Sequence, residues 1–64
     1  MQEGLLRRAE RFVLVHMNNA GTWDKGGIKG VWQETDGTIC ISYENGQWFH
    51  YKETDGRISW WEGA

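Results

Sequence analysis

The chain has 64 residues, a net charge of −2 at neutral pH, nine glycines, one cysteine and no proline. A chain of this length buries only about 60% of its unfolded surface, and one thiol excludes an internal disulfide. We therefore expect a single domain, residues 1–64, stabilised by packing of its nine aromatic residues or by self-association. The lone thiol and the lack of a long apolar run predict a cytoplasmic protein that does not associate with membranes.

An amphipathic helix is predicted over residues 2–17, because apolar side chains recur there at helical spacing. The predicted apolar stripe consists of Leu5, Leu6, Ala9, Phe12, Val13, His16 and Met17. The segment "NNAG" then supplies residues that favour a helix end. The stretch "RFVLVHM" is rich in β-branched residues, which leaves open whether residues 12–17 are helix or strand. Residues 22–30 are predicted to form an irregular connection.

A four-stranded antiparallel meander is predicted over residues 31–61, with strands at 31–35, 38–43, 47–53 and 57–61. The separators are Asp36-Gly37, Asn45-Gly46 and Asp55-Gly56, which are strong hairpin signals because tight loops need positive φ angles. The hexamers "ETDGTI" (34–39) and "ETDGRI" (53–58) are nearly identical. We interpret this repeat as two turns at the same end of the sheet, not as a duplicated binding site.

The register is predicted from the need for one apolar face, since a one-residue slip inverts the faces. Two-residue loops at Asp36-Gly37 and Asp55-Gly56, with a three-residue loop at 44–46, satisfy this need. The face predicted to lie under the helix carries Trp32, Ile39, Ile41, Tyr43, Phe49, Tyr51, Ile58 and Trp60. The outer face carries Val31, Gln33, Cys40, Ser42, Trp48, His50, Lys52, Ser59 and Trp61.

Three segments resemble parts of known domains. "DGTICISYENG" is similar to the central hairpin of SH3-like and tudor-like barrels, and "GQWFHYKETDGRISWWE" to the latter half of WW domains. "ENGQWFHYKETDG" resembles the arm-binding domains of phage-type integrases, which read DNA with a sheet. Each segment covers less than half of the chain and transfers no site residue. We predict an α+β fold with the N-terminal helix packed on the meander; a small SH3-like barrel with an N-terminal helix is the alternative.

Catalysis is not expected, although this register places Cys40 opposite His50. Such a pair is the minimum of a thiol nucleophile and its base, but the sequence indicates no oxyanion pocket and the domain is too small to enclose a substrate. Binding of a metal by Cys40, His50 and one carboxylate is not expected either, because the usual spacing of ligands along the chain is absent. No cofactor is predicted.

The predicted outer face is the candidate partner-binding site, with Trp48, His50, Trp61, Cys40 and Lys52 as its residues. Two indoles there exceed what a small monomer normally leaves in water. A loop carrying Trp23, a second copy of the chain in a homodimer, or another protein would each cover them. Single-stranded nucleic acid is a further alternative, because bases stack on exposed rings of a sheet.

Charge is unevenly distributed along the chain. The residues after position 20 carry four Lys or Arg against seven Asp or Glu, which disfavours a general phosphate-binding surface. The predicted turn end is an acidic edge that would attract a basic partner, formed by Glu34, Asp36, Glu53 and Asp55. We predict a small regulator or inhibitor that docks on a protein, of the size often encoded by phages and plasmids. The alternative is a nucleic-acid-binding module that uses the sheet aromatics and the helix residues Arg7, Arg8 and Arg11.

Overall fold

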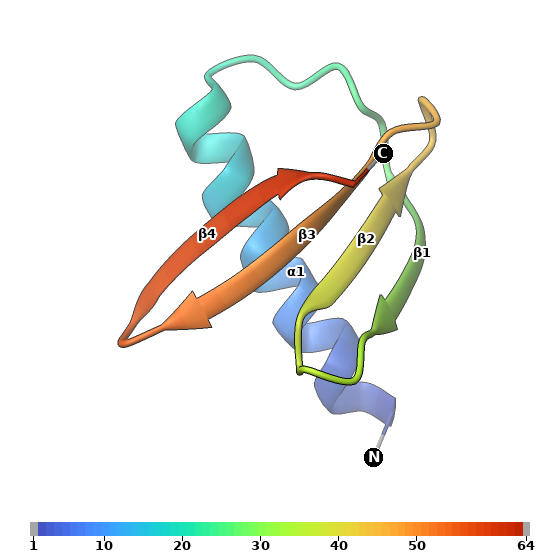
Figure 1. Ribbon diagram of the computed structural model, residues 1–64. Coiled ribbons are helices and arrows are strands. Elements are labelled where there is room, and N and C mark those ends of the chain that lie inside the picture. Colours follow the sequence, from blue (N-terminus) through green and yellow to red (C-terminus); the bar gives the residue numbers. More distant parts are fainter. Residues whose placement is uncertain (1, 64) are drawn as a thin grey trace.

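The computed structural model describes residues 2–63, which form one helix and a four-stranded antiparallel sheet (Figure 1). Helix α1 spans Gln2–Ala20, and the strands are β1 (Ile28–Gln33), β2 (Ile39–Tyr43), β3 (Trp48–Thr54) and β4 (Arg57–Glu62). The spatial order β1-β2-β3-β4 follows the chain, as expected for a meander. The predicted α+β class is confirmed, and the sheet is open instead of closing into the alternative barrel.

Helix α1 includes residues 12–17, so the strand alternative for this segment is wrong. The helix continues past the predicted end at Met17 to Ala20. Gly21 then adopts a φ of 82° and its N–H donates to the Met17 carbonyl at 3.3 Å, a helix end that glycine accommodates without a steric penalty. Leu6, predicted on the apolar stripe, is 49% exposed, because it lies at the margin of the buried face.

The core lies between α1 and the middle strands. Ala9 and Phe12 of the helix pack against a set of fully or almost fully buried side chains from β2 and β3: Ile39, Ile41, Tyr43, Phe49 and Tyr51. The Phe12 and Tyr51 rings are stacked with centroids 5.9 Å apart. Each such ring contributes about 1.5–3 kcal/mol through burial, so this layer is the main source of stability.

The second and third hairpins have the predicted registers. Residue Cys40 pairs with His50 across β2 and β3, and His50 pairs with Trp61 across β3 and β4. The β3–β4 turn uses Asp55 and Gly56 at φ angles of 53° and 79°, the left-handed pair that a two-residue hairpin loop requires.

The first hairpin differs from its prediction by one residue. Its loop is residues 35–37, closed by hydrogen bonds of Glu34 N to Thr38 O (2.8 Å) and Gly37 N to Glu34 O (2.9 Å). Gly37 has a φ of 92°, as in a type I turn followed by a bulge. Trp32 consequently pairs with Cys40, and Val31 with Ile41. The predicted faces of β1 are therefore inverted, with Trp32 on the outer face and Val31 against the core.

Strand β1 also begins earlier than predicted, at Ile28, with an irregularity in the pairing between Ile28 and Gly30. The segment before it is tied to the β2–β3 turn, because Gly27 N donates to the Glu44 carboxylate (2.9 Å) and Asn45 N to the Lys25 carbonyl (3.1 Å).

Residue Trp23 packs on the helix side of the sheet. Its ring lies edge-on to His16 at 5.0 Å and to Tyr43 at 5.2 Å, and its Nε1 donates to the Gly26 carbonyl at 3.0 Å. The alternative in which a loop carrying Trp23 covers the outer face is therefore wrong.

A series of hydrogen bonds between buried polar side chains crosses the core. The Tyr51 hydroxyl lies 2.7 Å from His16 Nδ1 and 2.6 Å from the Tyr43 hydroxyl. His16 is only 6% exposed, and burial together with the positive charge of Lys25 lowers its pKa. Within residues 2–63 every buried side-chain nitrogen or oxygen has a hydrogen-bond partner, as a stable core requires.

We expect the free energy of unfolding to fall as the pH is lowered from about 7 to 5, because the unfolded chain protonates His16 at its ordinary pKa of about 6.5 while the native state resists protonation. Stability is therefore present above the unfolded pKa and declines below it until the lowered native pKa is reached. Urea titrations across this range measure the slope. His16→Gln, which retains His50, should show a flatter profile; an unchanged slope would assign the pH dependence to other groups.

Candidate functional site

One side of the sheet is not covered by the helix, because α1 lies behind the other side (Figure 1). On the open side four rings form a continuous row. The ring centroids are 5.3 Å apart for Trp32 and Trp48, 4.8 Å for Trp48 and His50, and 5.0 Å for His50 and Trp61. We call these four residues the tryptophan face.

The two ends of this row are the most accessible. Trp32 is 39% exposed and Trp61 is 47% exposed, whereas Trp48 is half-buried. Gly63 lies against the Trp48 indole, and its N–H donates to the Trp48 carbonyl at 2.8 Å. Large apolar side chains of this exposure, grouped in one row, are characteristic of an interaction surface.

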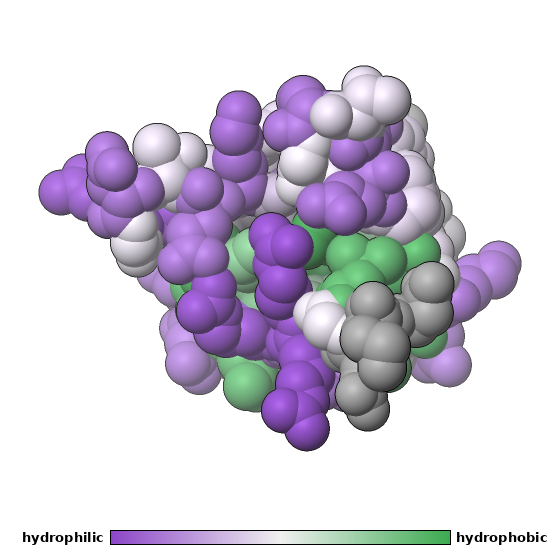
Figure 2. Space-filling view, turned by 90° about the horizontal axis from the view of Figure 1, so that it is seen from below, coloured by the Kyte–Doolittle hydropathy of each residue, from purple (hydrophilic) through white to green (hydrophobic). Residues whose placement is uncertain are grey.

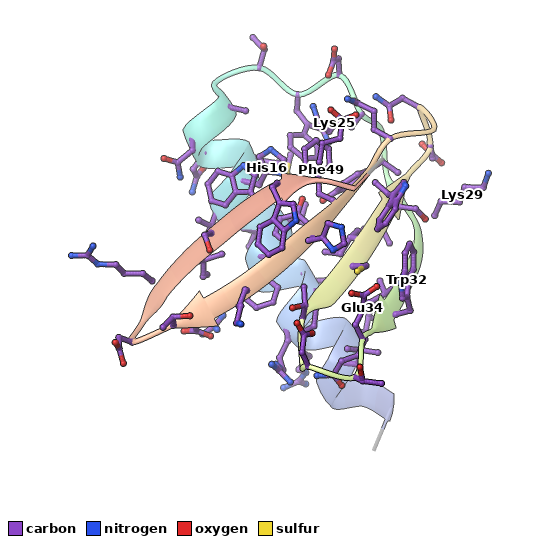
Figure 3. All side chains as sticks on the ribbon, viewed as in Figure 1. His16, Lys25, Lys29, Trp32, Glu34 and Phe49 are labelled. Carbon is purple, nitrogen blue, oxygen red and sulfur yellow. The ribbon has the colours of Figure 1, made fainter. Side chains whose placement is uncertain are left out.

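Beneath the row lies a cluster of three different ionisable groups. Cys40 Sγ is 3.5 Å from His50 Nδ1, and a carboxylate oxygen of Glu34 completes a set whose atoms all lie within 4.8 Å of one another. Figure 3 shows the Glu34 side chain directed toward this sulfur from the end of β1. Burial, and then the negative charges of Glu34 and Asp36, raise the pKa of the Cys40 thiol to about 11.

The structure brings most of the predicted site residues together. Trp48, His50 and Trp61 lie side by side on the open face, and Cys40 is fully buried below them. Lys52 is exposed and pairs with Ser59 farther along the same strands.

Sequence reasoning missed two residues of this site. Trp32 was assigned to the core because the first turn was predicted to have two residues, and Glu34 was assigned only to the acidic edge. No local signal could have placed them, because the same triplet Thr-Asp-Gly occurs at both turns. It forms a three-residue loop at 35–37, whereas at 54–56 only Asp55 and Gly56 form the loop.

The turn end of the sheet carries charges of both signs. A hollow of about 400 Å³ lies between α1 and the β1–β2 and β3–β4 turns, and its charged lining residues are Arg8, Asp36, Lys52, Glu53 and Asp55. Figure 2 views the molecule from below, and hydrophilic residues cover most of that side. Glu53 forms an ion pair with Arg11 of the helix. Asp36, Glu53 and Asp55 of the predicted acidic edge line this hollow, and Glu34 is exposed beside the same β1–β2 turn.

No protein-family model, curated protein or solved structure matches this chain. Within residues 2–63 no helix is long and apolar enough to cross a membrane.

Proposed function

We propose that this protein is a small, non-catalytic, cytoplasmic regulator or inhibitor that docks on a protein partner through the tryptophan face. The observation that carries the proposal is the row of Trp32, Trp48, His50 and Trp61 on the side of the sheet that the helix does not cover. Tryptophan is the residue type most enriched in the few positions that dominate binding energy at protein interfaces.

The face is suited to binding because it is rigid before a partner arrives. Each ring contacts its neighbour, and the strands below are joined by tight turns. Ordering flexible side chains costs about 0.5–1.5 kcal/mol each on association, so a preformed row of rings loses little. Indoles also bring a large contact area with few rotatable bonds.

Charge selects the kind of partner. Cys40 lies beneath the tryptophan face, and Glu34 and Asp36 are close enough to it to raise the pKa of its thiol. The chain has a net charge of −2. A complementary surface would offer an apolar groove for the indoles and basic side chains near these carboxylates. The same acidic balance disfavours the phosphate backbone of nucleic acid.

The state of Cys40 supports a non-catalytic role. Nucleophilic attack requires a thiolate that can reach its substrate, whereas this sulfur is fully buried and its thiol pKa is raised to about 11.

We test the proposal with Trp32→Ala and Trp61→Ala, using Leu14→Ala as the control because Leu14 is 61% exposed on α1. Each tagged protein is used to capture partners from source-cell extract, and the captured protein is then purified and titrated directly. We expect each tryptophan variant to bind about tenfold or more weakly, since hot-spot truncations cost about 2 kcal/mol or more, while Leu14→Ala binds as the wild type does.

Two other results would overturn the proposal and name its replacement. Dimerisation that depends on protein concentration in ultracentrifugation, and is lost in both tryptophan variants, would make this face a self-association surface. Binding of single-stranded oligonucleotides that weakens steeply with salt and requires the same tryptophans would make it a nucleic-acid platform. Circular dichroism of each variant establishes that it is folded.

A further inference from the structure

We propose that Glu34, Cys40 and His50 form a binding site for a divalent transition-metal ion of the zinc type, with one coordination position left for water. Glu34 directly follows β1, Cys40 lies on β2 and His50 lies on β3. They offer one carboxylate oxygen, one sulfur and one imidazole nitrogen. This site goes beyond the docking role proposed above and shares His50 with the tryptophan face.

The separation of the sulfur and the nitrogen fits tetrahedral coordination. Zinc lies about 2.3 Å from a thiolate sulfur and about 2.0–2.1 Å from an imidazole nitrogen, so a tetrahedral angle places these two atoms about 3.6 Å apart. Cys40 Sγ and His50 Nδ1 are 3.5 Å apart. A carboxylate oxygen of Glu34 lies within 4.8 Å of both atoms, and its exposed side chain is free to turn toward the same ion.

The donor set selects the metal. A thiolate and an imidazole together favour zinc-like ions over magnesium and calcium, which prefer sites made entirely of oxygen. Three protein ligands with one free position is the arrangement of zinc sites that retain a bound water.

The surroundings hold the ligands in place. The His50 ring lies between Trp48 and Trp61, nearly parallel to the latter at an interplanar angle of 15°, which restricts rotation of the imidazole. Cys40 is fixed in the fully buried centre of β2.

The carboxylate also favours a cation, because an oxygen of Glu34 lies within 4.8 Å of the Cys40 sulfur. A divalent cation would offset the charge of this carboxylate and replace the thiol proton, which is released to solvent.

Cobalt(II) titration of the reduced, metal-free protein provides the test. Bound Co²⁺ should produce a thiolate-to-metal absorption band in the near ultraviolet and the intense visible bands of a four-coordinate ion, and added Zn²⁺ should abolish both. Glu34→Gln and His50→Gln should each weaken Co²⁺ binding by more than about 100-fold, the upper end of the loss that an outer-shell change causes. Cys40→Ser should remove the charge-transfer band.

The matched control is Glu10→Gln, which neutralises an exposed carboxylate on α1, behind the opposite side of the sheet. It should bind Co²⁺ as the wild type does. The proposal is overturned if the wild type gives no band at excess Co²⁺, or if Glu34→Gln and His50→Gln bind with unchanged affinity, which would indicate a single thiolate acting alone. Glu34 is exposed, so its variant should remain folded and keep the test decisive even if Cys40→Ser does not fold.

Discussion

Replacement of Phe12 by alanine is expected to lower the free energy of unfolding by about 3–5 kcal/mol, the range for deleting a buried aromatic ring. Phe12 is 1% exposed and stacks on Tyr51 in the middle of the contact between helix and sheet. A chain of this length has a total stability of only about 3–10 kcal/mol. We therefore expect Phe12→Ala to be largely unfolded at physiological temperature, as measured by circular dichroism and urea denaturation.

Leu14→Ala is the matched control for this prediction. The change also shortens an apolar side chain on α1, but at a position that is 61% exposed, and surface substitutions usually alter stability by no more than about 0.5 kcal/mol. Equal losses in the two variants would contradict the packing of α1 described above.

Removing the Tyr51 hydroxyl is expected to have the second largest effect. This oxygen joins His16 Nδ1 to the Tyr43 hydroxyl, so Tyr51→Phe leaves two buried polar groups without their partner. Each such group costs about 1–3 kcal/mol, and we expect a loss of about 2–4 kcal/mol in the free energy of unfolding. Chemical denaturation followed by tryptophan fluorescence measures it.

The comparison with Tyr43→Phe separates this series of hydrogen bonds from general packing. Tyr43 is also fully buried, but its hydroxyl is at the end of the series, so its removal leaves the Tyr51–His16 hydrogen bond intact. We expect a smaller loss, of about 1 kcal/mol. A greater loss for Tyr43→Phe than for Tyr51→Phe would show that the central position of the Tyr51 oxygen is energetically unimportant.

Local sequence was sufficient for the helix and for two of the three hairpins. The apolar spacing around Ala9, Phe12 and His16 predicts the buried face of α1 because a helix repeats every 3.6 residues. The triplet at 44–46 and the pair Asp55-Gly56 predict their own registers. These registers place Cys40, Trp48, His50 and Trp61 on one side of the sheet, so most of the tryptophan face could be predicted.

The candidate metal cluster could not be predicted from spacing along the chain. Its three residues lie at positions 34, 40 and 50 and come together only through strand pairing. The predicted pairing of β2 and β3 already places Cys40 opposite His50, as the structure does. Glu34 joins these two residues only in the observed register of β1. Because the first turn was predicted one residue too short, the predicted site lacked both the third ligand, Glu34, and Trp32.

The repeated hexamer shows what the local sequence determines and what depends on tertiary packing. By itself, Glu-Thr-Asp-Gly determines that the chain reverses at residues 34–37 and again at 53–56, since aspartate and glycine tolerate the backbone angles of tight turns. It does not determine the length of the loop. The first copy forms a three-residue loop and the second a two-residue loop.

What differs between the two copies is the environment of the residue that follows. Thr38 is buried and its N–H donates to Asp36 Oδ1 at 3.0 Å, whereas Arg57 is exposed. The longer first loop places Val31 against the core under α1 and Trp32 against Trp48 on the open side. The sequence thus determined the helix, the strands and the sites of the turns through local conformational preferences. The packing of β1 against the core under the helix decided which face its tryptophan occupies, because side chains alternate between faces and a shift of one residue exchanges them.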